Sequence, residues 1–232
     1  MSRTRELPAG GRAVEVEPER LAGFLDRFAA GHGGAVATTV APQQVDVTAV
    51  DGWTASVLVP FGPLAAQPGQ WDGIAVDELL DHLMAPRTIG LFLVRLGGYS
   101  VGIARAGVVL SSSTGSRLVH GRSAAGGQSQ QRFARRREGQ ARVALQAAAN
   151  TAARVLLPRA EELDAVVLGG DTTALRSLAA DSRLTALLER AEPRVLDIPE
   201  PRRAILDEAA RRARCVEVRL LPRSTSSEPG HG

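Results

Sequence analysis

Two glycines and a glutamine, Gly126, Gly127 and Gln128, stand directly before a long helical pattern and form the stretch best suited to chemistry. Glycine has no Cβ, so it adopts φ > 0 without strain and allows backbone N–H groups to come close to a ligand. Gln128 adds a neutral amide that offers both a donor and an acceptor. The tripeptide therefore predicts a loop tip built for close approach.

Arginine dominates the residues around this tripeptide. The nearby arginines, one before it and five after it, are Arg122, Arg132, Arg135, Arg136, Arg137 and Arg142. All 28 basic side chains of the chain are arginine, and the planar guanidinium favours bidentate contacts with phosphate. Such a local concentration of positive charge predicts a polyanionic partner, although the net charge of the whole chain is only +3.

The flanks of the tripeptide carry a family resemblance. The run His120-Gly121-Arg122 precedes it, and Ser129 and then Arg132-Phe133-Ala134-Arg135 follow it. This pattern resembles the catalytic middle domain of the eukaryotic and archaeal class I peptide-chain release factors, and it is unlike the flanks found in ordinary bacterial release factors. Three residues, 123–125, stand as an insertion between the two motifs and depart from the pattern of that family.

The resemblance implies a substrate and a set of roles. The expected substrate is the ester that links a nascent peptide to the 3′ end of a tRNA, in the peptidyl-transferase centre of the large ribosomal subunit. Gln128 would stabilise developing charge with its backbone N–H and help to place the attacking water with its side chain, while Gly126 and Gly127 would shape the loop. The six arginines given above would contact ribosomal RNA. The chain has no lysine and so lacks the lysine-containing stop-codon motif of these factors, which implies the bacterial branch that acts in ribosome quality control on stalled or split large subunits.

Two other readings come from different classes of protein. A ribonuclease-H-like nuclease would share the fold, but it holds two metals with carboxylates on its first strands, and residues 91–110 contain no acid. A non-catalytic ribosome-binding or RNA-binding module would keep the fold and the basic helix, and only Gln128 and the paired glycines argue against it. The turn Gly169-Gly170-Asp171 lacks the further glycines and the lysine of phosphate loops, so we interpret it as a structural strand-to-helix turn.

The remaining composition excludes several kinds of site. Cys215 is the single cysteine, so neither a disulfide framework nor a cysteine-rich metal site is expected, and the four histidines lack metal-binding spacing. We predict no bound metal and no cofactor. No apolar run is long enough to span a bilayer, and the N-terminus lacks the apolar segment of a signal peptide. These features predict a cytoplasmic protein with no membrane partner, and we expect a monomer.

Hydrophobic periodicity predicts an α/β fold, with a mixed sheet that carries helices on both faces, as in the ribonuclease-H-like middle domain of release factors. Strands are expected near residues 45–59, 91–112, 165–168, 195–198 and 216–221, and helices near residues 21–28, 76–83, 129–157, 172–180, 184–191 and 202–214. The expected domains are a flexible leader at 1–15, a helix–hairpin–helix elaboration at 16–87, the catalytic domain at 88–221 and a disordered tail at 222–232.

Overall fold

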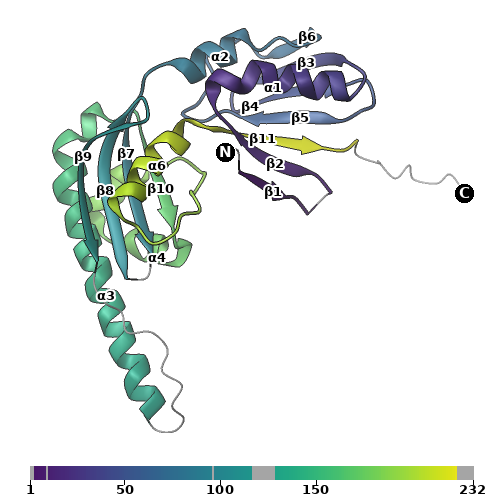
Figure 1. The fold of residues 1–232 in the computed structure, drawn as a ribbon. Coiled ribbons are helices and arrows are strands. Elements are labelled where there is room, and N and C mark those ends of the chain that lie inside the picture. The colour runs from purple at the N-terminus through teal and green to yellow at the C-terminus, as the bar shows by residue number, and fades with distance from the viewer. Residues whose placement is uncertain (1–2, 9, 96, 117–128, 224–232) are drawn as a thin grey trace, which may run out of the picture. The chain divides into compact units, whose positions relative to one another are not determined.

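A computed structural model describes residues 3–8, 10–95, 97–116 and 129–223 (Figure 1). The chain forms two compact units, one from Met1–Ala85 with Arg214–Gly232 and one from Pro86–Ala213. Each unit has its own hydrophobic core. Among the described residues, no helix is both long enough and apolar enough to cross a membrane.

The first unit is a seven-stranded sheet with two helices. Its strands are β1 (Thr4–Glu6), β2 (Arg12–Val16), β3 (Ala35–Ala41), β4 (Gln44–Ala49), β5 (Thr54–Leu58), β6 (Gly69–Asp72) and β11 (Val216–Leu221). Their order across the sheet is β1-β2-β11-β5-β4-β3-β6, and every pair is antiparallel. The helices are α1 (Pro18–Gly31) and α2 (Asp77–Met84). Because β11 lies between β2 and β5, residues from the two ends of this chain meet inside one sheet.

Alternating side chains give this sheet one apolar face. Val216 and Val218 of β11 are fully buried and pack in the same core as Leu21 and Leu25 of α1. The residue between the two valines, Glu217, lies on the opposite face, where it accepts hydrogen bonds from arginine side chains of β1 and β11. The period of two along β11 therefore separates an apolar face covered by helices from a charged face.

The second unit holds a four-stranded sheet and the longest helix of the described chain. Its strands are β7 (Thr88–Arg95), β8 (Gly98–Arg105), β9 (Val108–Ser116) and β10 (Ala165–Gly170). Its helices are α3 (Ser129–Leu156), η1 (Leu157–Glu162), α4 (Thr172–Leu178), η2 (Ser182–Leu184), α5 (Thr185–Leu188) and α6 (Arg203–Arg214). The strand order is β10-β7-β8-β9, in which β10 runs parallel to β7 and the other two pairs are antiparallel.

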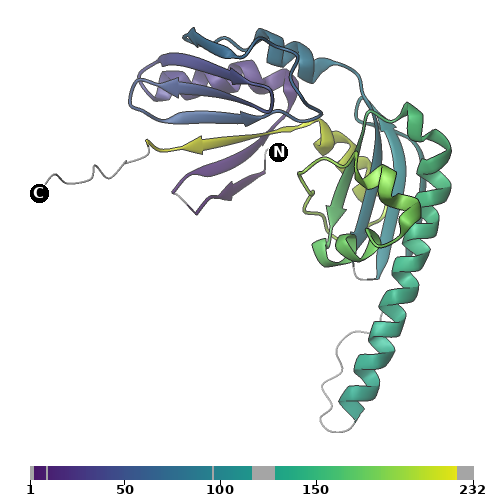
Figure 2. The ribbon, with the colours of Figure 1, turned by 180° about the vertical axis from the view of Figure 1, so that it is seen from behind.

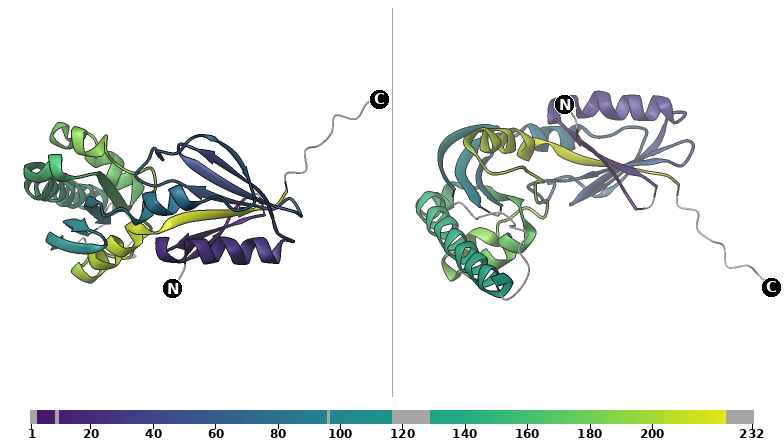
Figure 3. Two further views of the ribbon diagram at one scale, coloured as in Figure 1. Left: turned by 90° about the horizontal axis from the view of Figure 1, so that it is seen from above. Right: turned by 60° about the horizontal axis from the view of Figure 1, so that its bottom comes forward.

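Helices cover both faces of this mixed sheet, with α3 and α6 on opposite sides (Figure 3). On one face, Ala148 and Ala152 of α3 are buried in the same core as Val101 of β8. On the other face, α6 approaches so closely that a Cβ added at Gly102 of β8 would lie 2.8 Å from the side chain of Leu206. The same Cβ would lie 2.8 Å from the backbone oxygen of Ser111 in β9, so a residue without a side chain is required at this point of β8. The predicted fold class, an α/β mixed sheet with helices on both faces, is confirmed.

Three sequence-based assignments need correction. Residues 1–15 were expected to form a flexible leader, but β1 and β2 pair with each other and β2 pairs with β11. The strand at 216–221 was assigned to the catalytic domain, yet it completes the sheet of the first unit. The strand expected at 195–198 is reduced to a single bridge from Leu196 to Gly169, since prolines stand on both sides of this stretch and cannot donate to a ladder.

Candidate functional site

The Gly126-Gly127-Gln128 tripeptide and Arg122 lie outside the described residues. The structure does show the two elements that lead into and out of this segment. β9, an edge strand of the four-stranded sheet, ends at Ser116, and α3 begins at Ser129, the residue directly after Gln128. The tripeptide is therefore attached to the N-terminus of α3.

α3 is much longer than the sheet on which it packs. The run from Ser129 to Leu156 contains no proline and only one glycine, and it is rich in alanine, arginine and glutamine, all of which favour helix. Its 28 residues correspond to about 42 Å at 1.5 Å per residue, whereas the 8 residues of β8 span about 26 Å. The N-terminal half of α3 therefore extends past the end of the sheet (Figures 1 and 2).

The predicted arginines share this projecting half. Positions 132, 135, 136 and 142 fall within an arc of about 120° on an ideal helix, on the side opposite positions 148 and 152, which face the sheet. Position 137 lies outside this arc. The structure describes the side chain of Arg142, which is exposed. On an ideal helix, this spacing puts the exposed Arg142 on the same side as positions 132, 135 and 136.

The C-terminal half of α3 is held tightly. Ala148, Ala152 and Leu156 are almost completely buried, and the two alanines allow the helix axis to approach the strands closely. The hydroxyl of Thr151 donates a hydrogen bond to the Tyr99 hydroxyl at 3.2 Å. This half therefore fixes the helix to the sheet through packing and a directional polar contact.

A second set of polar contacts joins the outer flank of α3 to η2. The Oδ1 atom of Asn150 accepts from Nε2 of Gln146 at 3.3 Å and from Nη2 of Arg183 at 2.8 Å. Arg183 also donates through Nε and Nη2 to the two carboxylate oxygens of Asp181, at 2.9 and 2.6 Å. The hydrogen bond from Arg183 and the nearby positive charge hold the pKa of Asp181 below its ordinary value. We call these four residues the α3 brace.

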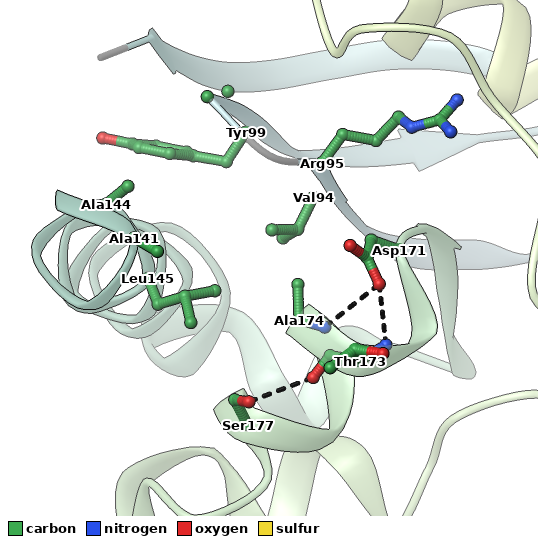
Figure 4. Close-up of a pocket in the computed structure, with 12 residues that line it drawn as sticks. Val94, Arg95, Tyr99, Ala141, Ala144, Leu145, Asp171, Thr173, Ala174 and Ser177 are labelled. Atoms are coloured by element: carbon green, nitrogen blue, oxygen red, sulfur yellow. Dashed lines mark hydrogen bonds between the residues drawn. The ribbon is translucent and has the colours of Figure 1, made fainter. Parts of the chain in front are cut away.

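An apolar pocket lies beneath α3 where the helix leaves the sheet (Figure 4). Its volume is about 240 Å³, and α3 contributes Ala141, Ala144 and Leu145 to its wall. The charged groups at its rim already have structural partners: Nη1 of Arg95 donates to the carbonyl oxygen of Ile198 at 2.5 Å, and the side chain of another rim residue caps α4. Ala141, Ala144 and Leu145 therefore form an apolar wall, and the two charged residues that line the pocket serve the fold.

The turn after β10 is structural, as the sequence predicted. Gly170 has φ +105°, and a Cβ at this position would collide with the carbonyl oxygen of Val94. Asp171 then accepts hydrogen bonds from the N–H groups of Thr173 and Ala174, which caps the first turn of α4. The glycine is required by backbone geometry and the aspartate by helix capping.

The α3 brace was not identified from the sequence. Its one local signal is Asn150, a weak helix former inside an otherwise alanine-rich stretch. Its partner Arg183 lies 33 positions further along the chain, and the pairing depends on how η2 packs against α3. Only the three-dimensional arrangement brings the two side chains together.

Residues 87–219 match the sequence profile of the Actinobacteria/chloroflexi VLRF1 release factor family. The chain belongs to this family. The matched region spans the whole of the four-stranded sheet and α3, and it includes the Gly126-Gly127-Gln128 tripeptide and all of the predicted RNA-binding arginines. The match confirms the resemblance to release factors that the sequence suggested. Release factors act in translation, so the chain belongs to a family of translation proteins.

Solved structures show weaker similarity to this VLRF1 family member. The crystal structure of an archaeal translation termination factor, aRF1, aligns at 13% identity and a TM-score of 0.40, over 85% of this chain and 70% of that chain. A second archaeal protein aligns at 15% identity and a TM-score of 0.37, over 70% of this chain and 48% of that chain. No curated protein is significantly similar in sequence.

Proposed function

We propose that this VLRF1 family member hydrolyses the ester bond of peptidyl-tRNA on stalled or split large ribosomal subunits and so releases the nascent chain. The observation that supports this most strongly is the long helix α3, which starts directly after Gln128, runs about 42 Å and carries arginines along its projecting half. A narrow, positively charged rod with a glycine-rich tip is suited to a deep site lined by RNA phosphates.

The proposed chemistry needs few protein groups. Hydrolysis of an ester by water proceeds without a covalent nucleophile, provided that the water is positioned and the developing oxyanion is stabilised. In this proposal the backbone N–H of Gln128 supplies the charge stabilisation and its amide side chain orients the water. Gly126 and Gly127 leave room for the backbone to reach the ester.

Binding is assigned to the arginines. Arg132, Arg135, Arg136, Arg137 and Arg142 on α3, together with Arg122 before the tripeptide, would contact ribosomal RNA phosphates. Each such contact releases condensed counterions, so binding depends on salt concentration. The proposed partners are the large ribosomal subunit, its RNA and peptidyl-tRNA, and the proposed setting is the cytoplasm, where the protein acts as a monomer.

The decisive experiment measures single-turnover release of peptide from peptidyl-tRNA on purified large subunits, with binding measured in parallel. Gln128→Ala should bind normally and lower the release rate by about 10²–10³, the usual effect of losing one positioned polar group in a transition state. Gln131→Ala is the matched control, because it makes the same change three residues away within α3. If Gln128→Ala releases peptide at the parent rate, the tripeptide is not catalytic, and a non-catalytic ribosome-binding module takes the place of the enzyme.

A further inference from the structure

The direction of α3 is weakly fixed by packing at the level where the helix leaves the sheet. Residues 141–147 are all exposed or partly exposed, and the continuous buried stripe begins at Ala148. On the sheet side of this stretch lies the pocket of about 240 Å³ rather than filled core. Apart from Leu145, whose side chain packs against the core, apolar contacts at this level leave room for the projecting half to tilt.

The α3 brace acts at this same level, on the opposite flank. Gln146 directly follows Leu145 of the pocket wall, and Asn150 lies one turn further along, beside the buried Ala149. Arg183 links Asn150 to Asp181, the N-cap residue of η2, and the Gln146 side chain also hydrogen-bonds Asp181. The Arg183–Asp181 pair is bidentate, so it restricts both the distance between the guanidinium and the carboxylate and their relative orientation. The helix is thus held by apolar packing of its C-terminal half, in a core that also includes Leu184 of η2, and by the brace on its flank.

A small rotation at the brace becomes a large displacement at the tip. Asn150 stands 21 residues from Ser129, which is about 32 Å along the helix axis. A tilt of about 5° would move the start of α3 by about 3 Å, whereas a misplacement of about 1 Å can lower a catalysed rate by about 10²-fold. Exposed ion pairs contribute little to folding stability, so the effect of the brace falls mainly on the direction of the helix.

We propose that Asn150 and Arg183 are positioning residues: they fix the direction of α3 and thereby the place of the Gly126-Gly127-Gln128 tripeptide relative to the sheet. The catalytic consequence rests on the proposed function, whereas the effect on helix direction does not. Both donors to Asn150 use its Oδ1 atom, so an acceptor at position 150 is what the brace requires.

The first measurement is independent of activity. Spin labels on Ser129→Cys and Leu110→Cys, with Cys215→Ala to remove the single native thiol, report the distance between the start of α3 and the exposed surface of β9. Asn150→Leu should shift or broaden this distance by about 3 Å or more, since leucine cannot accept a hydrogen bond although it favours helix. Asn150→Asp is the matched control, because it keeps the acceptor, and its distances should equal those of the parent. Melting temperatures should differ by no more than about 4 °C across the series.

The second measurement is the single-turnover release rate at saturating large subunits. Asn150→Leu should lower this rate at least about tenfold, and Asn150→Asp should restore it. Unchanged label distances in Asn150→Leu would overturn the proposal, and so would changed distances with an unchanged rate. A parent protein that releases no peptide would instead refute the proposed function, and the label distances would still decide whether the brace sets the direction of α3.

Discussion

A proline placed in the projecting half of α3 should separate catalysis from folding. Val143 is 47% exposed and lies five residues before Ala148, the first fully buried residue of the helix. Val143→Pro removes the N–H that an α-helix pairs with the carbonyl of residue 139, and the ring clashes with that carbonyl. The expected result is a kink at this point, while the buried contacts of Ala148 and Ala152 remain.

The size of the effect follows from the helix geometry. Ser129 is 14 residues from Val143, or about 21 Å, and a proline kink of about 20° would displace it by about 7 Å. This displacement is much larger than the misplacement of about 1 Å that can already lower a catalysed rate by about 10²-fold. The single-turnover release rate should therefore fall by about 10²-fold or more. The free energy of unfolding should fall by about 3 kcal/mol, because the interactions that the proline removes are local to the helix.

The assay pairs peptide release with thermal unfolding followed by circular dichroism. Val143→Ala is the control, because it truncates the same exposed side chain and keeps the backbone N–H; both its rate and its stability should match the parent. A Val143→Pro protein that is folded and releases peptide at the parent rate would show that catalysis does not depend on a straight α3, and the reasoning from helix length would be refuted.

Two further outcomes test the charges. Replacing Arg135 and Arg137 with glutamate should weaken co-sedimentation with large subunits. It should also reduce the slope of log binding constant against log salt concentration by about 0.7–0.9 for each phosphate that is no longer neutralised. The control is Arg202→Glu, which should change neither quantity, because Arg202 pairs with an exposed glutamate away from α3. A hydrogen bond from Arg183 holds the pKa of Asp181 in the folded protein below its ordinary value of 3.8. The contribution of the ionised Asp181 carboxylate to stability is therefore present above pH 3.8, and it is lost as the pH falls through the pKa that Asp181 has in the folded protein. The stability gap between the parent and Asp181→Asn should therefore be full at neutral pH and vanish in strong acid, as measured by denaturant unfolding across this range; a gap that persists in strong acid would contradict the assignment.

Much of the fold follows from local patterns. The alternation around Asp51-Gly52 predicted the β4–β5 hairpin, and the proline-free run after Gln128 predicted α3 as far as residue 157. The predicted pairing of β7 with β8 is also present, and so is the predicted helix α6. In each case the signal lies within a short window, where side-chain periodicity and turn residues act together.

The errors arise where distant partners decide the structure. β2, with the sequence RAVEV, reads as part of a polar leader until its partner β11 is known, and that partner lies about 200 residues away in the chain. The first unit shows the same effect in β3, whose alanines and threonines give little hydrophobic contrast. For the site, the tripeptide and its arginines were recognisable by type and spacing, whereas the α3 brace depends on packing between elements.

The position of β11 bears on the order in which the chain acquires structure during its own synthesis. Residues 86–213 leave the ribosome as one contiguous block and have all of their sheet partners within that block. The first unit, although its synthesis starts earlier, lacks an interior strand until residue 221 has emerged, and without it β2 and β5 have no common neighbour. The sheet would remain split into β1-β2 and β5-β4-β3-β6, each with an exposed edge that can pair with other chains. The unit that contains β2 and β5 is therefore completed only after residues 86–213 have been made, and its unpaired edges stay open to other chains until β11 emerges.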